Sequence, residues 1–201
     1  KTAIHRVIFD RIEAGTYIIA AALTKGYLKI KNIKPKIINT EIKVLQKMGV
    51  KILKKENYLI ASRSIKLKSI NIITKPYPGF PTDLQAQIMV LMMEADGISN
   101  IKENIFENRF MHVSELRRMG AKIETEGNKA KIFGKCKLNG AELMATDLRA
   151  SVSLVLAGLI PSNTTIVNRI YHLDRGYEKI ETKLSKCGAI IKRLKWIKKN
   201  L

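Results

Sequence analysis

An aspartate at the end of a stiff loop is the first residue whose surroundings suggest chemistry. Asp83 follows the segment 76–82, PYPGFPT, in which three prolines and a glycine restrict the backbone. A general base must be held in one position, and such a loop would hold it. Asp83 also stands where a helix should begin, so its carboxylate could simply cap that helix, as could Asp10 and Asp147. The sequence leaves both roles open.

Three arginines lie in segments that packing does not explain. Arg109 belongs to 105–112, IFENRFMH, where polar and aromatic residues alternate between a predicted strand and a predicted helix. Arg149 falls in the first turn of a predicted buried helix, where a guanidinium requires an acidic side chain or a bound anion. Arg175 precedes another helix, beside Gly176. Together these arginines would suit a phosphate or a carboxylate, because guanidinium groups bind both in bidentate geometry.

These side chains occur at related points of an internal repeat. Three segments open with an Asp (10, 83 and 147) and close about 40 residues later with a Gly (49, 120 and 188). The stretches 17–23, 84–93 and 148–159 are apolar on nearly all faces, which predicts buried helices. A second helix ends at each closing glycine, the expected place for a left-handed C-cap.

Short strands are predicted around the two helices of each segment. They fall at 6–9, 27–33, 50–53 and 58–61, at 70–73, 98–101, 121–123 and 130–133, and at 141–144, 164–167 and 190–194. The resulting β-α-β-α-β-β repeats cover about 6–62, 70–134 and 141–194, and the third lacks its final strand. The pattern predicts a single α/β domain over 1–201, an inside-out α/β barrel with helices inside and sheets outside.

Composition and charge say less about the class of protein than the repeat and the charged side chains do. The net charge of +20, from 37 basic and 17 acidic residues, favours an anionic partner, and a nucleic-acid-binding protein is one alternative. However, the lysines are spread through the chain, without interleaved aromatic residues, which favours a solvated basic surface over nucleic-acid binding. No apolar run reaches the roughly 18 residues of a membrane helix, and the start lacks the apolar core of a signal peptide.

The histidines and cysteines form no metal or disulfide pattern. His5, His112 and His172 are scattered, and Cys136 and Cys187 follow no metal-ligand spacing. Cys187 stands where the other two repeats have Met, which predicts a packed position. Two free thiols are typical of a reducing cytoplasm, so we expect a cytoplasmic protein.

Five motifs resemble the enolpyruvyl transferase family, and the match spans nearly the whole chain. They are FPTDLQAQ (80–87), FENRFMH (106–112), ATDLRAS (145–151), YHLDRGYE (171–178) and DRIEAGT (10–16). They are similar to the branch that uses UDP-N-acetylglucosamine, while the shikimate branch differs at these places. The resemblance implies two inside-out α/β domains, each of three β-α-β-α-β-β units. This chain would be the C-terminal one, with the other domain absent.

The resemblance also implies a reaction. An enolpyruvyl group passes from phosphoenolpyruvate to the 3-hydroxyl of UDP-N-acetylglucosamine, the first committed step of peptidoglycan synthesis, without a metal or an organic cofactor. Asp83 matches the carboxylate that deprotonates the sugar hydroxyl. The UDP-sugar site is expected to be lined by Thr82, Asp83 and the backbone of Ile105, with Phe106 beside it.

The remaining roles concern phosphoenolpyruvate. Arg149 and Arg175 match arginines that meet its carboxylate and phosphate, and Arg109 supports the same pocket. The family's catalytic Cys belongs to the other domain, and neither Cys136 nor Cys187 lies in its motif. We therefore expect no turnover by this chain alone. An inactive or split fragment that only binds the UDP-sugar is an alternative.

Overall fold

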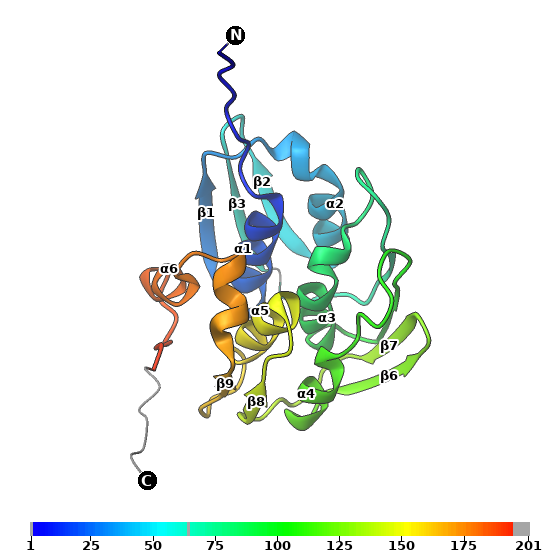
Figure 1. The fold of residues 1–201 in the computed structure, drawn as a ribbon. Helices are drawn as coiled ribbons and strands as arrows, with labels where there is room; N and C mark the ends of the chain where they lie inside the picture. The colour runs from blue at the N-terminus through cyan, green and yellow to red at the C-terminus, as the bar shows by residue number, and fades with distance from the viewer. Residues whose placement is uncertain (1, 64, 195–201) are drawn as a thin grey trace.

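Three helices that are buried on nearly all faces form the centre of the fold. They are α1 (Arg11–Leu23), α3 (Gln85–Met93) and α5 (Leu148–Ala157). In the computed structural model, which describes residues 2–63 and 65–194, α3 packs against both α1 and α5 (Figure 1). Every residue of α3 is buried, including Gln85 and Gln87, as expected of a helix that is apolar on nearly all faces. The predicted buried helices are confirmed, although α1 begins at Arg11 rather than at 17, because Asp10 caps it.

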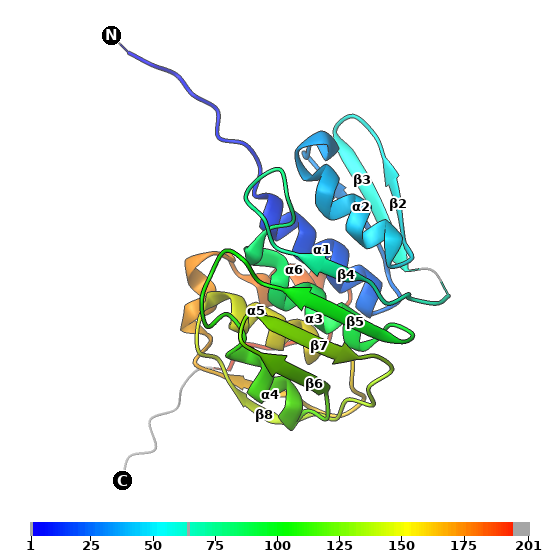
Figure 2. The ribbon, with the colours of Figure 1, turned by 90° about the vertical axis from the view of Figure 1, so that its right-hand side faces the viewer.

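Three sheets cover these helices. The first has the antiparallel order β1-β3-β2, from β1 (Tyr27–Lys31), β2 (Val50–Lys54) and β3 (Tyr58–Arg63). The second has the order β4-β5-β7-β6, from β4 (Asn71–Ile73), β5 (Ile98–Lys102), β6 (Lys122–Glu126) and β7 (Lys129–Phe133). The third pairs β8 (Glu142–Met144) and β9 (Ile166–Asn168) in parallel. Figure 2 shows the second sheet in front of α3 and α5, so the helices lie inside.

A second helix follows in each repeat and ends at a glycine. These helices are α2 (Asn39–Lys47), α4 (His112–Arg118) and α6 (Ile180–Lys186). The glycines that follow them, Gly49, Gly120 and Gly188, have φ angles of 99°, 100° and 97°. Glycine adopts this conformation without strain, so the predicted left-handed C-caps are confirmed. Short 3-10 helices precede α2, α3 and α6: η1 (Pro35–Ile38), η2 (Thr82–Leu84) and η3 (Ile170–Arg175).

Two predicted strands are wrong. Residues 6–9 form no strand, and the segment before α1 projects from the rest of the fold, with Val7 and Ile8 exposed (Figure 2). Residues 190–194 also form no strand. Because a strand requires a hydrogen-bonded neighbour, an apolar sequence alone does not produce one. Among the described residues, only the middle repeat therefore has all four of its strands.

The prediction that Cys187 is packed is also wrong. Met48 and Met119, its counterparts in the other repeats, are fully buried, whereas Cys187 is exposed. A strand follows Gly49 at β2 and another follows the second glycine at β6, but no strand follows Gly188 in the described part of the chain. Without a following strand up to residue 194, Cys187 stays exposed at this end of α6.

Candidate active site

The three equivalent aspartates have different partners. Asp10 Oδ1 accepts hydrogen bonds from the backbone N–H groups two and three residues later, at 2.7 and 3.1 Å. Asp147 Oδ1 does the same at 2.7 and 3.0 Å. Asp83 caps no helix, since neither η2 nor α3 begins with a side-chain cap. The sequence left helix capping open as a role for all three aspartates. In the structure, Asp10 and Asp147 cap helices and Asp83 does not.

Asp83 instead lies between two guanidinium groups. Its Oδ1 atom accepts from Arg109 Nη2 and from Arg149 Nε, each at 3.0 Å. The arginine side chains are 19% and 20% exposed and the aspartate 38%, so the cluster is partly open to solvent. Arg149 thus has the acidic partner that its place in a buried helix requires. Two positive charges against one negative charge leave the cluster suited to a further anion.

The loop after β5 brings Arg109 to this cluster. Its guanidinium carbon lies 4.8 Å from the centre of the Phe106 ring, which is within the range of a cation–π contact. Phe106 is 57% exposed and Ile105 40%, although both are large apolar residues. An apolar rim beside a charged cluster is typical of a ligand site.

Glu103 belongs to the same region, and the sequence did not single it out. Its side chain is buried, and its carboxylate accepts from Thr82 Oγ1 at 2.9 Å and from the backbone N–H of Ile105 at 2.8 Å. The only signal in the sequence is its position directly after β5, two residues before Ile105. Many glutamates follow a strand, so this position alone would not have identified it.

Arg175 is the predicted site residue that stands apart. It is exposed, and its side chain forms no hydrogen bond or ion pair with any residue in the described ranges. Its segment η3 nevertheless packs against α5, and a Cβ at Gly176 would lie 2.9 Å from Leu148 Cδ2. Arg175 is therefore carried next to the helix of Arg149 without joining the Asp83 cluster.

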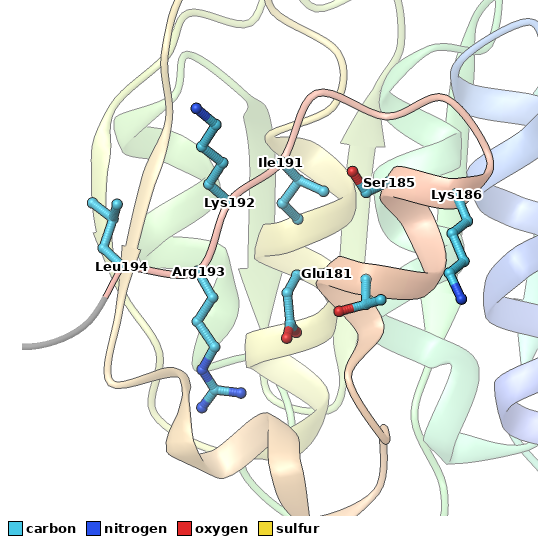
Figure 3. Close-up of a pocket in the computed structure, with 8 residues that line it drawn as sticks. Glu181, Ser185, Lys186, Ile191, Lys192, Arg193 and Leu194 are labelled. Carbon is cyan, nitrogen blue, oxygen red and sulfur yellow. The ribbon is translucent and has the colours of Figure 1, made fainter.

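Two hollows lie in different parts of the molecule. The smaller, about 220 Å³, is lined by residues that include Glu103, Phe106 and Arg109. The larger, about 600 Å³, lies between α6 and the segment 191–194 and contains none of the predicted site residues (Figure 3). The smaller hollow therefore adjoins the charged cluster through Arg109, whereas Asp83 and Arg149 do not line it.

A buried polar cluster joins the three repeats through one side chain from each. The hydroxyl groups of Thr16 and Tyr177 lie 2.8 Å apart, and Gln87 Nε2 donates to both at 3.4 and 3.3 Å. All three side chains are almost fully buried. Burial raises the pKa of Tyr177, so its hydroxyl keeps its proton at neutral pH.

His112 at the start of α4 is buried next to the loop that carries Arg109. Burial lowers the pKa of His112 to about 4, while the negative charge of Asp147 raises it and the positive charge of Arg109 lowers it further. The imidazole is therefore neutral at pH 7.

Neither a metal nor a membrane feature appears in residues 2–63 and 65–194. No three His, Cys, Asp or Glu side chains there are grouped so that they could hold a metal ion. No helix in those ranges is long and apolar enough to cross a membrane.

Comparison with known proteins identifies the family of this chain. A family model described as EPSP synthase (3-phosphoshikimate 1-carboxyvinyltransferase) matches residues 1–184, and the chain belongs to this enolpyruvyl transferase family. Within the family, it is similar to proteins named UDP-N-acetylglucosamine 1-carboxyvinyltransferase. It is 64% identical over 190 residues to that of Pelagibacter ubique and 59% identical over 190 residues to that of Geotalea daltonii.

These alignments include most of this chain but less than half of each relative. They cover 94% of the chain and 46% of the Pelagibacter and Geotalea proteins. The chain therefore spans about half the length of the curated relatives it matches.

Solved structures support the same fold. The enolpyruvyl transferase NikO from Streptomyces tendae matches with a TM-score of 0.84 and 30% identity, over 91% of this chain and 44% of that one. EPSP synthase from Acinetobacter baumannii matches with a TM-score of 0.62 and 16% identity, over 81% of this chain and 40% of that one, which shows the fold alone. The predicted enolpyruvyl transferase-like α/β fold is thus confirmed.

Proposed function

We propose that this chain supplies part of the active site of an enzyme that transfers enolpyruvyl from phosphoenolpyruvate to the 3-hydroxyl of UDP-N-acetylglucosamine. The observation that carries the proposal is the position of Asp83 between Arg109 and Arg149, each 3.0 Å away. The identity of 64% to a relative named for this reaction supports the same substrate. The enzyme would act in the cytoplasm, at the first committed step of peptidoglycan synthesis, and thus serve wall biogenesis, cell shape and division.

Asp83 is the proposed general base. Its Oδ2 atom has no partner among the described residues, so it can accept the proton of the sugar 3-hydroxyl, whose oxygen then attacks C2 of phosphoenolpyruvate. C3 of phosphoenolpyruvate gains a proton as the tetrahedral intermediate forms. Elimination then removes a proton from C3 and breaks the bond between C2 and the phosphate oxygen, which restores the double bond and releases phosphate. Only the first of these proton transfers is assigned to a residue of this chain.

The arginines are proposed to hold phosphoenolpyruvate. Arg149 uses Nε for Asp83, which leaves its terminal nitrogens for an anion, and Arg175 is exposed and unpaired among the described residues. Fixed guanidinium groups stabilise charge that develops on the phosphate as the bond breaks. Arg109 supports this pocket through Asp83, while Thr82, Ile105 and Phe106 line the side proposed for the sugar nucleotide.

The rest of the active site is proposed to lie in the other half of the full-length protein. That half would contribute the cysteine that donates a proton to C3, as expected from the resemblance. We expect the 201-residue chain to bind the UDP-sugar weakly or not at all and to release no phosphate by itself. Phosphate release by the purified chain alone would contradict this expectation.

Calorimetry and a phosphate assay together test the proposed function. UDP-N-acetylglucosamine is titrated into the chain alone and into a mixture with the separately purified N-terminal half of a relative, and phosphate release is followed after phosphoenolpyruvate is added. Binding and turnover in the mixture are expected. A folded mixture that neither binds nor turns over would overturn the proposal.

The shikimate-branch reaction is the control for substrate. Shikimate 3-phosphate replaces the UDP-sugar in the same mixture and is also added as a competitor. We expect neither turnover nor competition, because identity to EPSP synthase from Acinetobacter baumannii is only 16%. Turnover with shikimate 3-phosphate would assign the chain to the shikimate branch of the family instead.

A further inference from the structure

Glu103 is a buried carboxylate that is surrounded by hydrogen-bond donors. It is 2% exposed and forms no ion pair within the described ranges. Its Oε1 atom accepts from Thr74 Oγ1 at 2.7 Å and from the backbone N–H groups of Ile105 and Phe106 at 2.8 and 3.1 Å. Its Oε2 atom accepts from Thr82 Oγ1 at 2.9 Å. Four donors therefore converge on one anionic side chain.

Such an arrangement constrains the residue type at this position. A buried carboxylate without a cation is costly unless hydrogen bonds replace the lost water. An ionised carboxylate has about four acceptor positions, which equals the number of donors around Glu103. An amide of the same shape has one acceptor oxygen, so it cannot accept at both the Oε1 and the Oε2 positions, and its N–H groups would face either Thr82 Oγ1 or the other three donors.

The donors belong to two separate loops of the candidate site. Thr82 directly precedes Asp83, and Thr74 lies at the start of the same loop, after β4. The N–H groups of Ile105 and Phe106 open the loop that carries Arg109. One carboxylate therefore ties the loop of the proposed base to the loop of its guanidinium partner.

The turn between β6 and β7 holds the backbone of Glu103 through two hydrogen bonds. Its backbone N–H donates to the carbonyl oxygen of Asn128 at 2.8 Å, and Asn128 Nδ2 donates to the carbonyl oxygen of Glu103 at 2.9 Å. The four donors are thus held against a residue that is attached to the four-stranded sheet. This gives the two loops a common rigid support.

We infer that Glu103 is a positioning residue for the sugar-nucleotide side of the site. It acts through Thr82 and the Ile105–Phe106 backbone, which places Asp83 and the apolar rim in the geometry that the UDP-sugar meets. The inference rests on the proposed function, and Glu103 itself touches no substrate. Loss of its charge should weaken sugar-nucleotide binding while leaving the phosphoenolpyruvate contacts largely unchanged.

The substitution Glu103→Gln tests this role in the mixture of the chain with the N-terminal half of a relative. We expect the Kd of UDP-N-acetylglucosamine and its KM to rise at least tenfold, with the KM of phosphoenolpyruvate changed less than twofold. Thr82→Val removes one of the four donors and should have a smaller effect. The two effects should not add in the double variant, because both changes break the same hydrogen bond.

Glu94→Gln is the matched control. Glu94 is a partly buried glutamate at the opposite end of α3 from Asp83, and its Oε2 atom lies 3.5 Å from Arg63 Nη1. This variant should be somewhat less stable than the unmodified chain but should bind the UDP-sugar equally well. If Glu103→Gln and Glu94→Gln give the same Kd within twofold, the positioning role is refuted and the proposed function stands.

Amide exchange decides the inference even if the proposed function fails. The N–H groups of Ile105 and Phe106 should exchange slowly in the unmodified chain without any ligand, since both are bonded to the buried carboxylate. They should exchange at least tenfold faster in Glu103→Ala, which removes both acceptor oxygens, and at the original rate in Glu94→Gln. Equal exchange rates in all three proteins would show that Glu103 does not hold this loop.

Discussion

Arg149 Nε lies 3.0 Å from Asp83 Oδ1, and the two residues are 66 positions apart in the chain. Asp83 follows the rigid loop of the second repeat, whereas Arg149 belongs to the first turn of α5 in the third. Arg109, also from the second repeat, reaches the same oxygen. The charged cluster therefore exists only when two repeats pack side by side.

Asp83→Asn should remove activity without unfolding the chain. The amide cannot act as a base, so phosphate release in the two-half mixture should fall by about 10²-fold or more. The cluster is partly exposed, so its charge contributes only modestly to stability, and the free energy of unfolding should change by about 1 kcal/mol or less. Urea denaturation and the phosphate assay measure the two effects.

The control for Asp83→Asn is Asp10→Asn. Asp10 caps α1 through its side chain, and Asn is an equally good cap, so both stability and activity should be retained. Equal losses of activity in the two variants would mean that Asp83 has no role beyond local structure.

Arg175→Ala should impair function but leave stability almost unchanged. Arg175 has no partner among the described residues, so the melting temperature of the chain should shift by less than about 1 °C, as for most exposed substitutions. In the two-half mixture, the KM of phosphoenolpyruvate should rise at least about tenfold, because a charge-assisted contact is lost. An unchanged KM would remove Arg175 from the proposed site.

His112 should make the chain less stable in mild acid. Its pKa is about 4 in the folded state against an ordinary value of 6.5, so the unfolded chain binds the extra proton between these values. The contribution is complete above pH 6.5 and is lost as the pH falls toward 4, on the order of 3 kcal/mol at most. Urea midpoints at several pH values measure it.

The variant His112→Met separates this effect from other titrations. The thioether is apolar and similar in size, so the decline between pH 6.5 and 4 should become shallower. Acid sensitivity that is identical in the two proteins would assign the effect to other groups.

Tyr177→Phe should destabilise the centre of the molecule. The change leaves Thr16 and Gln87 with one hydrogen-bond partner fewer in a buried site, which costs about 1–3 kcal/mol. Tyr171→Phe is the matched control, since Tyr171 is 57% exposed and should change stability by less than about 0.5 kcal/mol. A loss in the control equal to that in Tyr177→Phe would contradict the role of the buried cluster.

Gly134→Ala should be more harmful than Gly127→Ala, although both glycines flank β7. A Cβ at Gly134 would overlap the carbonyl oxygen of Ala95, so the backbone must move, at a cost of about 2–4 kcal/mol. A Cβ at Gly127 meets nothing within 4 Å, and its φ of +53° adds only about 1 kcal/mol of strain. Thermal unfolding of the two variants tests the order, and a larger loss at Gly127 would reverse it.

Most of the secondary structure could be predicted from the sequence because its signals are local. Residues 84–93 are apolar on nearly every face, and Gly49, Gly120 and Gly188 end their helices in a conformation that glycine favours. The strands at 6–9 and 190–194 could not be judged in this way. A strand depends on a neighbour that is often distant in sequence, and the apolar pattern does not say whether that neighbour is present.

The candidate site, too, could be predicted only in part. The sequence by itself determined which side chains carry charge and where they stand in each repeat, including Asp83, Arg109, Arg149 and Arg175. Only the tertiary structure decided that Asp83 pairs with two arginines while Asp10 and Asp147 cap helices. It also revealed Glu103, because burial and the convergence of four donors arise from packing between loops, which no local pattern encodes.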